Sequence, residues 1–447
     1  MKTKTLLFTA ITILTCIVSA QAQNVNIPDA NFKAALVSNG SINTNGDAEI
    51  QTSEAAAFTG GINVSYLGIN GGLTDLTGIE AFVALTYLDC SGNSLSSLNV
   101  STCTALTYLS CADSFWSSLT SLNVSGCTAL TNLDCSYNSL TSLDVSACTA
   151  LTNLDCSYNA LTSLDVSACT ALTNLYCSNN ALTSLDGATN TAIIELYCST
   201  NQLTSLDVSN CIALNYLICY GNQLTSLNVS ANTALIVMCC DNNQLTSLDV
   251  SSCTALTGLN CSLNSALTSL DVSANTALTS FFCNDNQLTS LDVSACTALT
   301  NLYCYNNQLT SLNVKNGNNI NMDLMSNNYG FLASNNPNLS CIEVDNVAWS
   351  NTNWANDIDA TAYFSENCSG AGISDINESN PPMFYPNPTT GTIYLSDPAN
   401  ISLSDLSGKL LLQEKNTNQL DLSALPAGMY FLSFGENNNQ LVKVIKE

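Results

Sequence analysis

The chain has 447 residues, with 34 acidic residues against 8 basic ones and a formal net charge of −26. It contains 22 cysteines and no histidine, and all of its basic residues are lysines. It therefore lacks an imidazole base, a histidine metal ligand and the guanidinium fork that binds phosphate in a bidentate manner. No basic residue lies between Lys33 and Lys315, so nucleic acids and anionic membranes are poor partners for this chain. These absences also lower the expectation of an enzyme.

Residues 1–22 have the pattern of an export signal. Two lysines precede an apolar run from Leu6 to Val18, and Ala20-Gln21-Ala22 fits a cleavage site. The run is too short to cross a bilayer, and no later segment is apolar enough to do so. We therefore predict a mature chain that starts at residue 23 and has no transmembrane segment.

A repeat of 21 residues fills the middle of the chain. Residues 151–171 read LTNLDCSYNALTSLDVSACTA, and the pattern L-x-x-L-x-C-x-x-N-x-L occurs in eleven units, with one spacing of 24 and one of 22 residues. Apolar and polar residues alternate around the second Leu and the Cys, which is typical of a short strand with one buried face. Stacking such units in register predicts a parallel sheet. The units begin at Leu85, Leu106, Leu130, Leu151, Leu172, Ile193, Leu214, Leu235, Leu256, Leu278 and Leu299.

This pattern resembles that of leucine-rich repeat proteins, with cysteine at the third apolar strand position. The resemblance implies a repeat solenoid, a horseshoe with the parallel β-sheet on its concave face. We predict the solenoid over residues 62–325, with about 11–12 repeats, between an N-terminal cap (23–61) and a C-terminal cap (326–368). Ten units carry Asn at the ninth position, where a buried amide can bond to the turn and the next rung as an asparagine ladder. The exception is Ser114, beside extra residues where we expect a bulge.

The cysteines fall into two columns of the repeat, one in the strands and one on the return arc. Buried thiols that act as small hydrophobes are the favoured interpretation. Disulfides between rungs and metal binding are disfavoured, because side chains in register point the same way and Cys-x-x-Cys pairs are missing. Cys341 and Cys368 instead flank a non-repetitive segment, and we predict a disulfide between them that closes the C-terminal cap.

Side chains beside the inward Leu and Cys project onto the concave face. The central column begins with acidic residues such as Asp134 and Asp155 and turns aromatic from Tyr176 onward. Aromatic rings with polar tips are enriched at binding surfaces, although tyrosines also pack on β surfaces without any ligand. The candidate ligand-binding residues are Tyr176, Tyr197, Tyr216, Tyr220, Phe282, Tyr303 and Tyr305.

Two acidic features raise the question of calcium. A column of outward aspartates on the return side, such as Asp144 and Asp165, is interpreted as a solvating edge because most rungs offer a single carboxylate. Before the repeats, residues 43–54 resemble a degenerate EF-hand loop, although Asn43 and Ala48 depart from the usual Asp and Gly. A loop inside the cap is the alternative, and no other cofactor is expected. The candidate calcium ligands are Asn43, Asn45, Asp47, Glu49 and Glu54.

The last part of the chain has a different composition. Residues 369–383 are rich in Gly and Ser with a Pro pair, which predicts a linker before a separate domain over residues 384–447. Strand-like segments at 392–395, 401–406 and 441–446, with a turn at Ser407-Gly408-Lys409, suggest six or seven short strands. Such a segment predicts a small all-β sandwich of the Ig-like kind.

This last segment resembles the C-terminal sorting domain of type IX secretion cargo from Bacteroidota. The match rests on its Tyr-Pro-Asn-Pro start, its Gly-Lys turn, the Leu-Pro-Ala-Gly-Met-Tyr segment and a last strand that ends in lysine. The region from Ile27 to Cys341 resembles leucine-rich repeat surface proteins of the same phylum. The resemblance implies the type IX machinery as a partner, a secreted or outer-membrane surface location, and removal of the tail. The implied sorting residues are Tyr385, Pro386, Asn387, Pro388, Gly408, Lys409, Gly428, Lys443 and Lys446.

The sequence therefore predicts an exported, non-enzymatic protein that binds a surface protein or glycan through its aromatic concave face. A structural surface-layer component without a specific ligand is the alternative, which fits the near-identical repeats and the exterior of Ser, Thr and Asn. Hydrolysis by paired carboxylates of Asp134 and Asp155 is a third and weaker hypothesis, because no acid or base partner with a tuned environment is evident.

Overall fold

A computed structural model describes residues 23–67, 72–113, 118–322, 330–368, 384–406, 408–434 and 440–447. The predicted export signal, the extra residues near Ser114 and the predicted linker lie outside the described residues. The chain divides into two compact units, Met1–Glu366 and Asn367–Glu447. Each unit has its own hydrophobic core.

Two helices form the N-terminal end of the first unit. Helix α1 (Ala30–Val37) begins after Asp29, whose carboxylate accepts hydrogen bonds from the backbone N–H groups of Asn31 (2.9 Å) and Phe32 (3.1 Å). This is an N-cap, which satisfies otherwise unpaired amides of the first turn. Helix α2 (Thr52–Ala57) starts with a capping box between Gln51 and Glu54. A single turn of 3-10 helix, η1 (Ile79–Ala81), follows, and the buried face of α1 joins the same core as the repeats.

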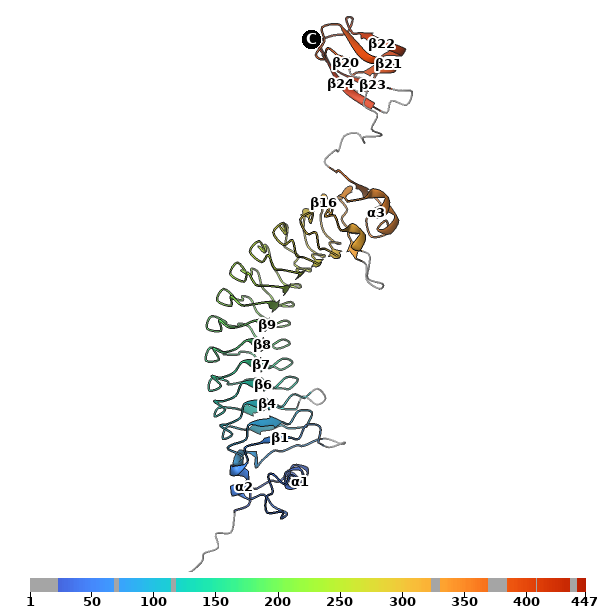
Figure 1. Ribbon diagram of the computed structural model, residues 1–447. Coiled ribbons are helices and arrows are strands. Elements are labelled where there is room, and N and C mark those ends of the chain that lie inside the picture. Colours follow the sequence, from blue (N-terminus) through green and yellow to red (C-terminus); the bar gives the residue numbers. More distant parts are fainter. Residues whose placement is uncertain are drawn as a thin grey trace, which may run out of the picture. The chain divides into compact units, whose positions relative to one another are not determined.

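Thirteen short strands form one parallel sheet in which each strand pairs with those of the neighbouring rungs. The sheet lines the inner side of the curved first unit (Figure 1), so the predicted solenoid with a concave parallel sheet is confirmed. The strands are β1 (Gly61–Asn63), β2 (Tyr87–Asp89), β4 (Tyr108–Ser110), β6 (Asn132–Asp134), β7 (Asn153–Asp155), β8 (Asn174–Tyr176), β9 (Glu195–Tyr197), β10 (Tyr216–Ile218), β11 (Val237–Cys239), β12 (Gly258–Asn260), β13 (Ser280–Phe282), β15 (Asn301–Tyr303) and β17 (Phe331–Leu332).

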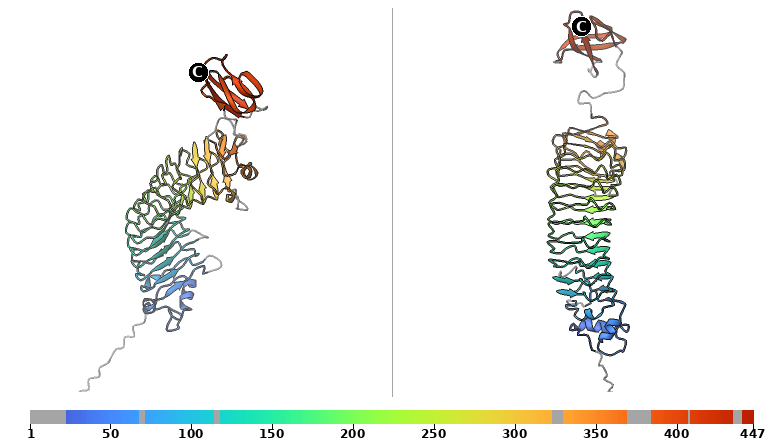
Figure 2. Two further views of the ribbon diagram at one scale, coloured as in Figure 1. Left: turned by 45° about the horizontal axis from the view of Figure 1, so that its top comes forward. Right: turned by 90° about the vertical axis from the view of Figure 1, so that its left-hand side faces the viewer.

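Shorter sheets lie on the return side of the coil, as the turned views show (Figure 2). Strands β3 (Ser97–Asn99) and β5 (Ser121–Asn123) pair in parallel near the N-terminal end. Near the other end a four-stranded parallel sheet forms, with a 3-10 turn and helix α3 beside it. The four strands are β14 (Ser290–Asp292), β16 (Ser311–Asn313), β18 (Cys341–Glu343) and β19 (Tyr363–Ser365). The 3-10 turn is η2 (Asn319–Asn321), and the helix is α3 (Val347–Asn353).

The predicted asparagine ladder is confirmed, and it ties each rung to the one before it rather than to the one after it. Asn159 is representative: its Nδ2 donates to the carbonyl oxygens of Cys135 (3.0 Å) and Cys156 (3.1 Å), and its Oδ1 accepts from the backbone N–H of Leu140 (3.0 Å). The ladder also runs past residue 325, where we expected the repeats to end. Asn336 donates to the carbonyl of Cys304 at 3.1 Å, and β17 extends the sheet beside it.

The nineteen cysteines of the repeats are free thiols, and all but the half-buried Cys239 are buried. Burial raises the pKa of Cys198 to about 12, so the thiol stays protonated and packs as a small hydrophobe. The buried cysteines form a strand column and a return column. They are Cys90, Cys111, Cys135, Cys156, Cys177, Cys198, Cys219, Cys240, Cys261, Cys283 and Cys304 in the strands, and Cys103, Cys127, Cys148, Cys169, Cys211, Cys253 and Cys296 on the return arc.

Cysteine and asparagine alternate in the return column because both donate to the same backbone carbonyl. The thiol of Cys127 lies 3.2 Å from the carbonyl oxygen of Val100. In another rung Asn232 Nδ2 donates to the carbonyls of Val208 (2.9 Å) and Cys211 (2.8 Å). Both residue types thus place a small buried donor at this position, which explains why they replace one another.

The C-terminal cap predicted over residues 326–368 contains a disulfide and an aromatic cluster. Cys341 and Cys368 are disulfide-bonded, as predicted. Trp354 is buried, and its ring stacks on Phe331 at 4.3 Å between centroids and meets Trp349 edge-on at 5.1 Å. This cluster covers the last rungs of the solenoid, which cannot bury their own apolar faces.

The second unit is an antiparallel β domain, as predicted, with a core of Ile393, Leu403, Leu432 and Val444 among other residues. Its described residues form five strands rather than six or seven. One long strand, residues 392–404, includes the segment expected at 392–395 and most of the one expected at 401–406. Its pairing with the next strand changes register on either side of Ala399. The strands are β20 (Phe384–Tyr385), β21 (Thr392–Ser404), β22 (Leu410–Asp421), β23 (Gly428–Phe434) and β24 (Gln440–Lys446).

Candidate functional site

The candidate surface consists of the residues that flank the buried leucine of each strand. In β8, Asn174 and Tyr176 lie on either side of buried Leu175, and the strand pairs in register with β9. The same arrangement recurs in each rung, so outward columns run along the sheet with roughly 4.8 Å between rungs. The column that follows the leucine is Asp89, Ser110, Asp134, Asp155, Tyr176, Tyr197, Ile218, Cys239, Asn260, Phe282 and Tyr303.

The acidic start of this column stabilises turns. Asp134 and Asp155 are neighbours in register on β6 and β7. Asp134 accepts hydrogen bonds from the backbone N–H (3.1 Å) and hydroxyl (2.7 Å) of Ser136, and Asp155 accepts one from the N–H of Ser157 (2.9 Å). Burial raises the pKa of Asp155, with a smaller contribution from the charge of Asp134. Each carboxylate is thus bonded to the turn that follows its own strand.

The first aromatic cluster lies on β8 and β9. The rings of Tyr176 and Tyr197 lie 5.0 Å apart between centroids. The Tyr176 hydroxyl donates to the carboxylate of Glu195 and accepts a hydrogen bond from Asn174 Nδ2 at 3.1 Å. Burial and the bond to Glu195 raise the pKa of Tyr176 to about 12. This hydroxyl is therefore a fixed, neutral donor to Glu195.

A second aromatic cluster lies on β13 and β15. The rings of Phe282 and Tyr303 are 4.7 Å apart, and those of Tyr303 and Tyr305 are 6.4 Å apart. Tyr216 lies on β10 between the two clusters, and Tyr220, just after it, is 39% exposed. The structure therefore places the seven predicted residues on one face, in two groups. Four lie in the rungs of β8 to β10 and three in those of β13 and β15, with β11 and β12 between the groups.

The sequence prediction missed a set of exposed tyrosines at the ends of the strands. Tyr137 and Tyr158 stack at 4.3 Å and are 41% and 46% exposed. Both have a left-handed backbone with φ of 54°, one residue before the ladder asparagine. Gly92 holds the equivalent position in an earlier rung and also has a positive φ. That glycine was the available signal, but Tyr rarely adopts this conformation, so the column was not recognised.

The outward aspartates of the return side cap turns. Asp165 Oδ1 accepts from the backbone N–H of Ser167 at 2.9 Å, and Asn228 makes the same bond to Ser230 at 3.0 Å. Hydrogen bonds from the hydroxyl and backbone of Ser167 lower the pKa of the fully exposed Asp165. Because asparagine serves equally well, the column requires a side-chain acceptor and not a charge.

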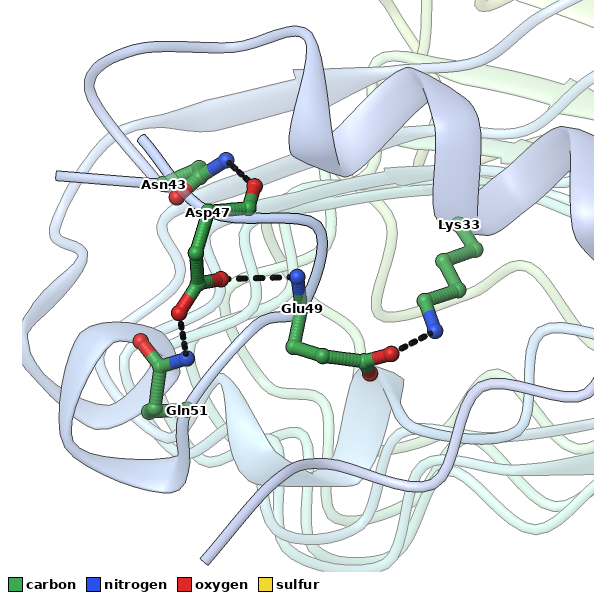
Figure 3. Close-up of polar contacts among 5 residues, drawn as sticks. All are labelled: Lys33, Asn43, Asp47, Glu49 and Gln51. Atoms are coloured by element: carbon green, nitrogen blue, oxygen red, sulfur yellow. Dashed lines mark hydrogen bonds and ion pairs between the residues drawn. The ribbon is translucent and has the colours of Figure 1, made fainter. Parts of the chain in front are cut away.

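The EF-hand-like loop is held together by hydrogen bonds within the cap (Figure 3). Asp47 accepts from the N–H of Glu49 (2.7 Å) and from Gln51 Nε2 (2.9 Å). Asn43 donates to the carbonyl of Asp47 at 2.7 Å, and Glu49 pairs with Lys33 at 2.6 Å.

The remaining candidate ligands of this loop are occupied in the same way. Glu54 accepts hydrogen bonds from the backbone N–H groups of Thr44 (2.8 Å), Asn45 (3.1 Å) and Gln51 (3.0 Å). Among the described residues no group of three or more His, Cys, Asp or Glu side chains that could hold a metal ion comes together. The hydrogen bonds of these residues hold the cap together, and calcium binding by them stays a prediction.

The predicted sorting residues connect the two ends of the second unit. Asn387 Nδ2 donates to the carbonyl of Lys443 and its Oδ1 accepts from the N–H of Ile445, both at 2.8 Å. Lys446 pairs with Gly428 across β23 and β24. Asn387 therefore bonds the Tyr-Pro-Asn-Pro segment to the last strand, whereas Gly408 and Lys409 form the turn between β21 and β22.

Two family models match parts of the chain. One, described as "Secretion system C-terminal sorting domain", matches residues 383–447. The other, described as "Leucine Rich repeats (2 copies)", matches residues 128–169 and 149–190. The chain thus carries leucine-rich repeats and a type IX sorting domain, which marks it for export and cell-surface attachment. No curated protein matches it. In the described part of the chain, no helix has the length and apolar character needed to span a bilayer.

Solved leucine-rich repeat structures resemble this chain. The functional domain of InlJ from Listeria monocytogenes, which includes a cysteine ladder, is 26% identical with a TM-score of 0.49, over 95% of this chain and 98% of that one. The internalin InlF of the same species is 21% identical (TM-score 0.48; 69% and 98% covered). The protein LIC12759 of Leptospira interrogans is 17% identical (TM-score 0.44; 70% and 97% covered).

Proposed function

We propose that this exported leucine-rich repeat protein, sorted by its C-terminal domain, is a non-enzymatic binding or adhesion protein of the cell surface. Its ligand is a surface protein or glycan that contacts the concave face. The observation that carries the proposal is the series of partly exposed aromatic rings that project in register from one sheet. Such rings provide contact area at a small cost in side-chain entropy.

The rigidity of the sheet supports this role. Each strand is fixed to its neighbour by the ladder asparagines, and the rings contact one another, as Tyr176 does Tyr197. A surface that is already ordered loses little conformational freedom when a partner binds. The proposed face is therefore preorganised for recognition.

The available side chains favour binding over catalysis. Burial raises the pKa of Cys239, the half-buried cysteine of the concave face, to about 11, so it is not a thiolate nucleophile at neutral pH. Asp134 and Asp155 are engaged with the turns that follow them. Neither feature supplies the tuned acid and base pair that hydrolysis needs.

The test is a triple substitution, Tyr176→Ser, Tyr197→Ser and Tyr303→Ser, examined on protein and glycan arrays and in a cell-adhesion assay. We expect binding to fall by about tenfold or more, because aromatic anchors commonly dominate an interface. The matched control is Tyr363→Ser, which removes a tyrosine that is 57% exposed on the return side. Unchanged binding by the triple variant would refute the site.

The second candidate is a structural surface-layer component. It is favoured by the mutual packing of the rings, because Phe282 and Tyr303 already cover part of each other's surface. A deletion strain with altered envelope architecture and unchanged ligand binding would support this role. Normal envelope architecture in that strain would count against it.

A further inference from the structure

The middle of the concave face departs from the repeat. Four rungs carry Thr and Asn just before the central leucine of the strand, as Thr173 and Asn174 do in the rung of β8. At these two positions the rungs of β9, β10 and β11 carry Ile194 and Glu195, Asn215 and Tyr216, and Ile236 and Val237. We call this group the central apolar patch. It comprises Ile194, Tyr216, Ile218, Ile236, Val237 and Cys239.

Four of these residues are neighbours in register on β10 and β11, and Ile194 and Ile236 lie on either side of Asn215 in the preceding column. Tyr216 and Ile218 on β10 pair in register with Val237 and Cys239 on β11. Ile194 is 36% exposed, and the other members are half-buried. On the far side of β11, Gly258 has no side chain, and a Cβ there would lie 3.7 Å from Val237. The flank of Val237 that faces β12 is therefore not covered by a neighbouring side chain.

The fold does not require these apolar residues. Asn301 holds the position of Val237, and Asn260 holds that of Ile218, in rungs with the same strand geometry. The isoleucines also forgo a hydrogen bond. Thr173 Oγ1 donates to the carbonyl of Thr152 at 3.1 Å, whereas an isoleucine in this column has no donor. The patch thus forgoes internal bonds and leaves apolar surface in water, which is typical of a surface that a partner covers.

The charges around the patch restrict the partner. Glu195 pairs in register with Tyr216, and Asp241 follows Cys239 by two residues. No lysine or arginine occurs between Lys33 and Lys315 to offset them, and the chain as a whole has a formal charge of −26. A second copy of this chain would bring like charges together, whereas a basic partner would be attracted.

We infer that the central apolar patch is the docking site of a basic protein segment, which places an apolar side chain over Ile218 and Val237 and its Lys or Arg residues near Glu195 and Asp241. This inference rests on the proposed function and selects a protein over a glycan as the ligand. A sugar hydroxyl that lost its water over Ile218, Val237 and Cys239 would find no strong hydrogen-bond partner there.

The experiment probes the mature full-length chain on an array of random-sequence peptides and on a glycan array. The test variant is Ile218→Asn with Val237→Asn, because the protein itself has Asn in both columns. The matched control is Asn153→Ser on β7, since Ser280 holds the same column of the repeat. Circular dichroism and thermal melts check that each variant is folded, and Val237→Asn alone replaces the double variant if that one does not fold.

We expect the parent to select peptides that combine Lys or Arg with a large apolar residue. The double variant should bind them at least about tenfold more weakly, as a hot-spot contact predicts, and the control should bind normally. Raising NaCl from about 0.05 M to about 0.5 M should weaken binding several-fold, because the rim charges are exposed. Three outcomes would overturn this inference and leave the proposed function standing. They are binding to glycans alone, binding to acidic peptides, and equally strong peptide binding by the double variant. Binding to neither array would instead overturn the proposed function.

Discussion

At the residue scale, buried amides connect the rungs of the solenoid. Asn201 donates from Nδ2 to the carbonyls of Cys177 (3.0 Å) and Cys198 (3.1 Å), while its Oδ1 accepts from the N–H of Leu182 (3.0 Å). All of these backbone groups lie where the chain turns out of the sheet and have no strand partner. One side chain therefore satisfies a set of groups that would otherwise be buried without hydrogen bonds.

We predict that Asn201→Leu lowers the free energy of unfolding by about 2–4 kcal/mol, since it leaves several buried backbone groups unpaired. Urea denaturation followed by circular dichroism measures this loss. The exposed neighbour provides a control, because Gln202→Ala changes no side-chain bond of the ladder. Equal stability of the two variants would show that the ladder is dispensable.

The aspartates of the return-side turns allow a test of whether their charge or their hydrogen bond stabilises the protein. Asp165→Asn preserves the acceptor to Ser167 and should leave the urea midpoint unchanged, whereas Asp165→Ala should lower it. Addition of calcium should not shift the midpoint of the parent through this column, because asparagine serves as well as aspartate there. A calcium-dependent rise that Asp165→Asn abolishes would instead support a metal ladder.

At the element scale, a buried cysteine recurs in strand after strand. The small contribution of each cysteine to the free energy of unfolding therefore adds along the sheet. The strand thiols of Cys198, Cys261 and Cys304 have pKa values raised to about 12, chiefly by burial, from an ordinary value of 9.0. The folded state therefore holds these protons more tightly than the unfolded state does. Stability that derives from neutral thiols is fully present below pH 9 and is lost as pH rises towards 12.

We predict that the urea midpoint, measured under reducing conditions, falls between about pH 9 and about pH 11 because the unfolded chain releases thiol protons first. Cys198→Ala should make this fall shallower, since it removes one of the linked groups. Reducing conditions keep oxidation from contributing to the change. A midpoint that stays constant over this range would contradict the assignment of the columns as buried neutral thiols.

The sequence predicted the features that repeat and are buried. Leu, Cys and Asn recur at fixed spacing because each rung must fill the same core and satisfy the same turn, so the sheet and the ladder could be anticipated. The cap disulfide could be predicted because its two cysteines lie outside the repeat columns. Features set by a single local conformation could not. Examples are the left-handed backbone of Tyr137, the additional rung of Asn336 and the long strand through Ala399. Each depends on neighbours that the spacing does not reveal.

The candidate site was predicted in part for the same reason. Alternation along each strand identifies which residues face outward, so the column of Tyr176, Tyr197 and Tyr303 could be predicted. Side-chain contacts across rungs were not predictable, such as the bond from Tyr176 to Glu195 that fixes its hydroxyl. The pairing of Glu49 with Lys33, a residue outside the EF-hand-like loop, was likewise not predictable from the spacing.

At the scale of the whole molecule, the solenoid and the sorting domain have separate hydrophobic cores. The core of the first unit ends with Phe364, and the second core begins with Ile393. The cap disulfide, Cys341 to Cys368, also lies before the second core. Removing the sorting domain should therefore leave the packing of the solenoid intact.

We predict that a chain truncated after residue 383 folds with an unchanged thermal midpoint for the solenoid but is not displayed at the cell surface. Antibody labelling of intact cells measures display, and circular dichroism of the purified fragment measures folding. The full-length chain in the same strain is the control. Normal display of the truncated chain would contradict the role of residues 384–447 in export.

The repeats at residues 130–150 and 151–171 differ at a single position, Ser139 against Ala160. Each presents the same carbonyl acceptors to the ladder asparagine that follows it and the same asparagine to the rung before it. Either unit can therefore be duplicated or deleted without leaving a broken bond at the junction. These two rungs are interchangeable modules, so gene-level gain or loss of such a unit can lengthen or shorten the solenoid at little cost in stability.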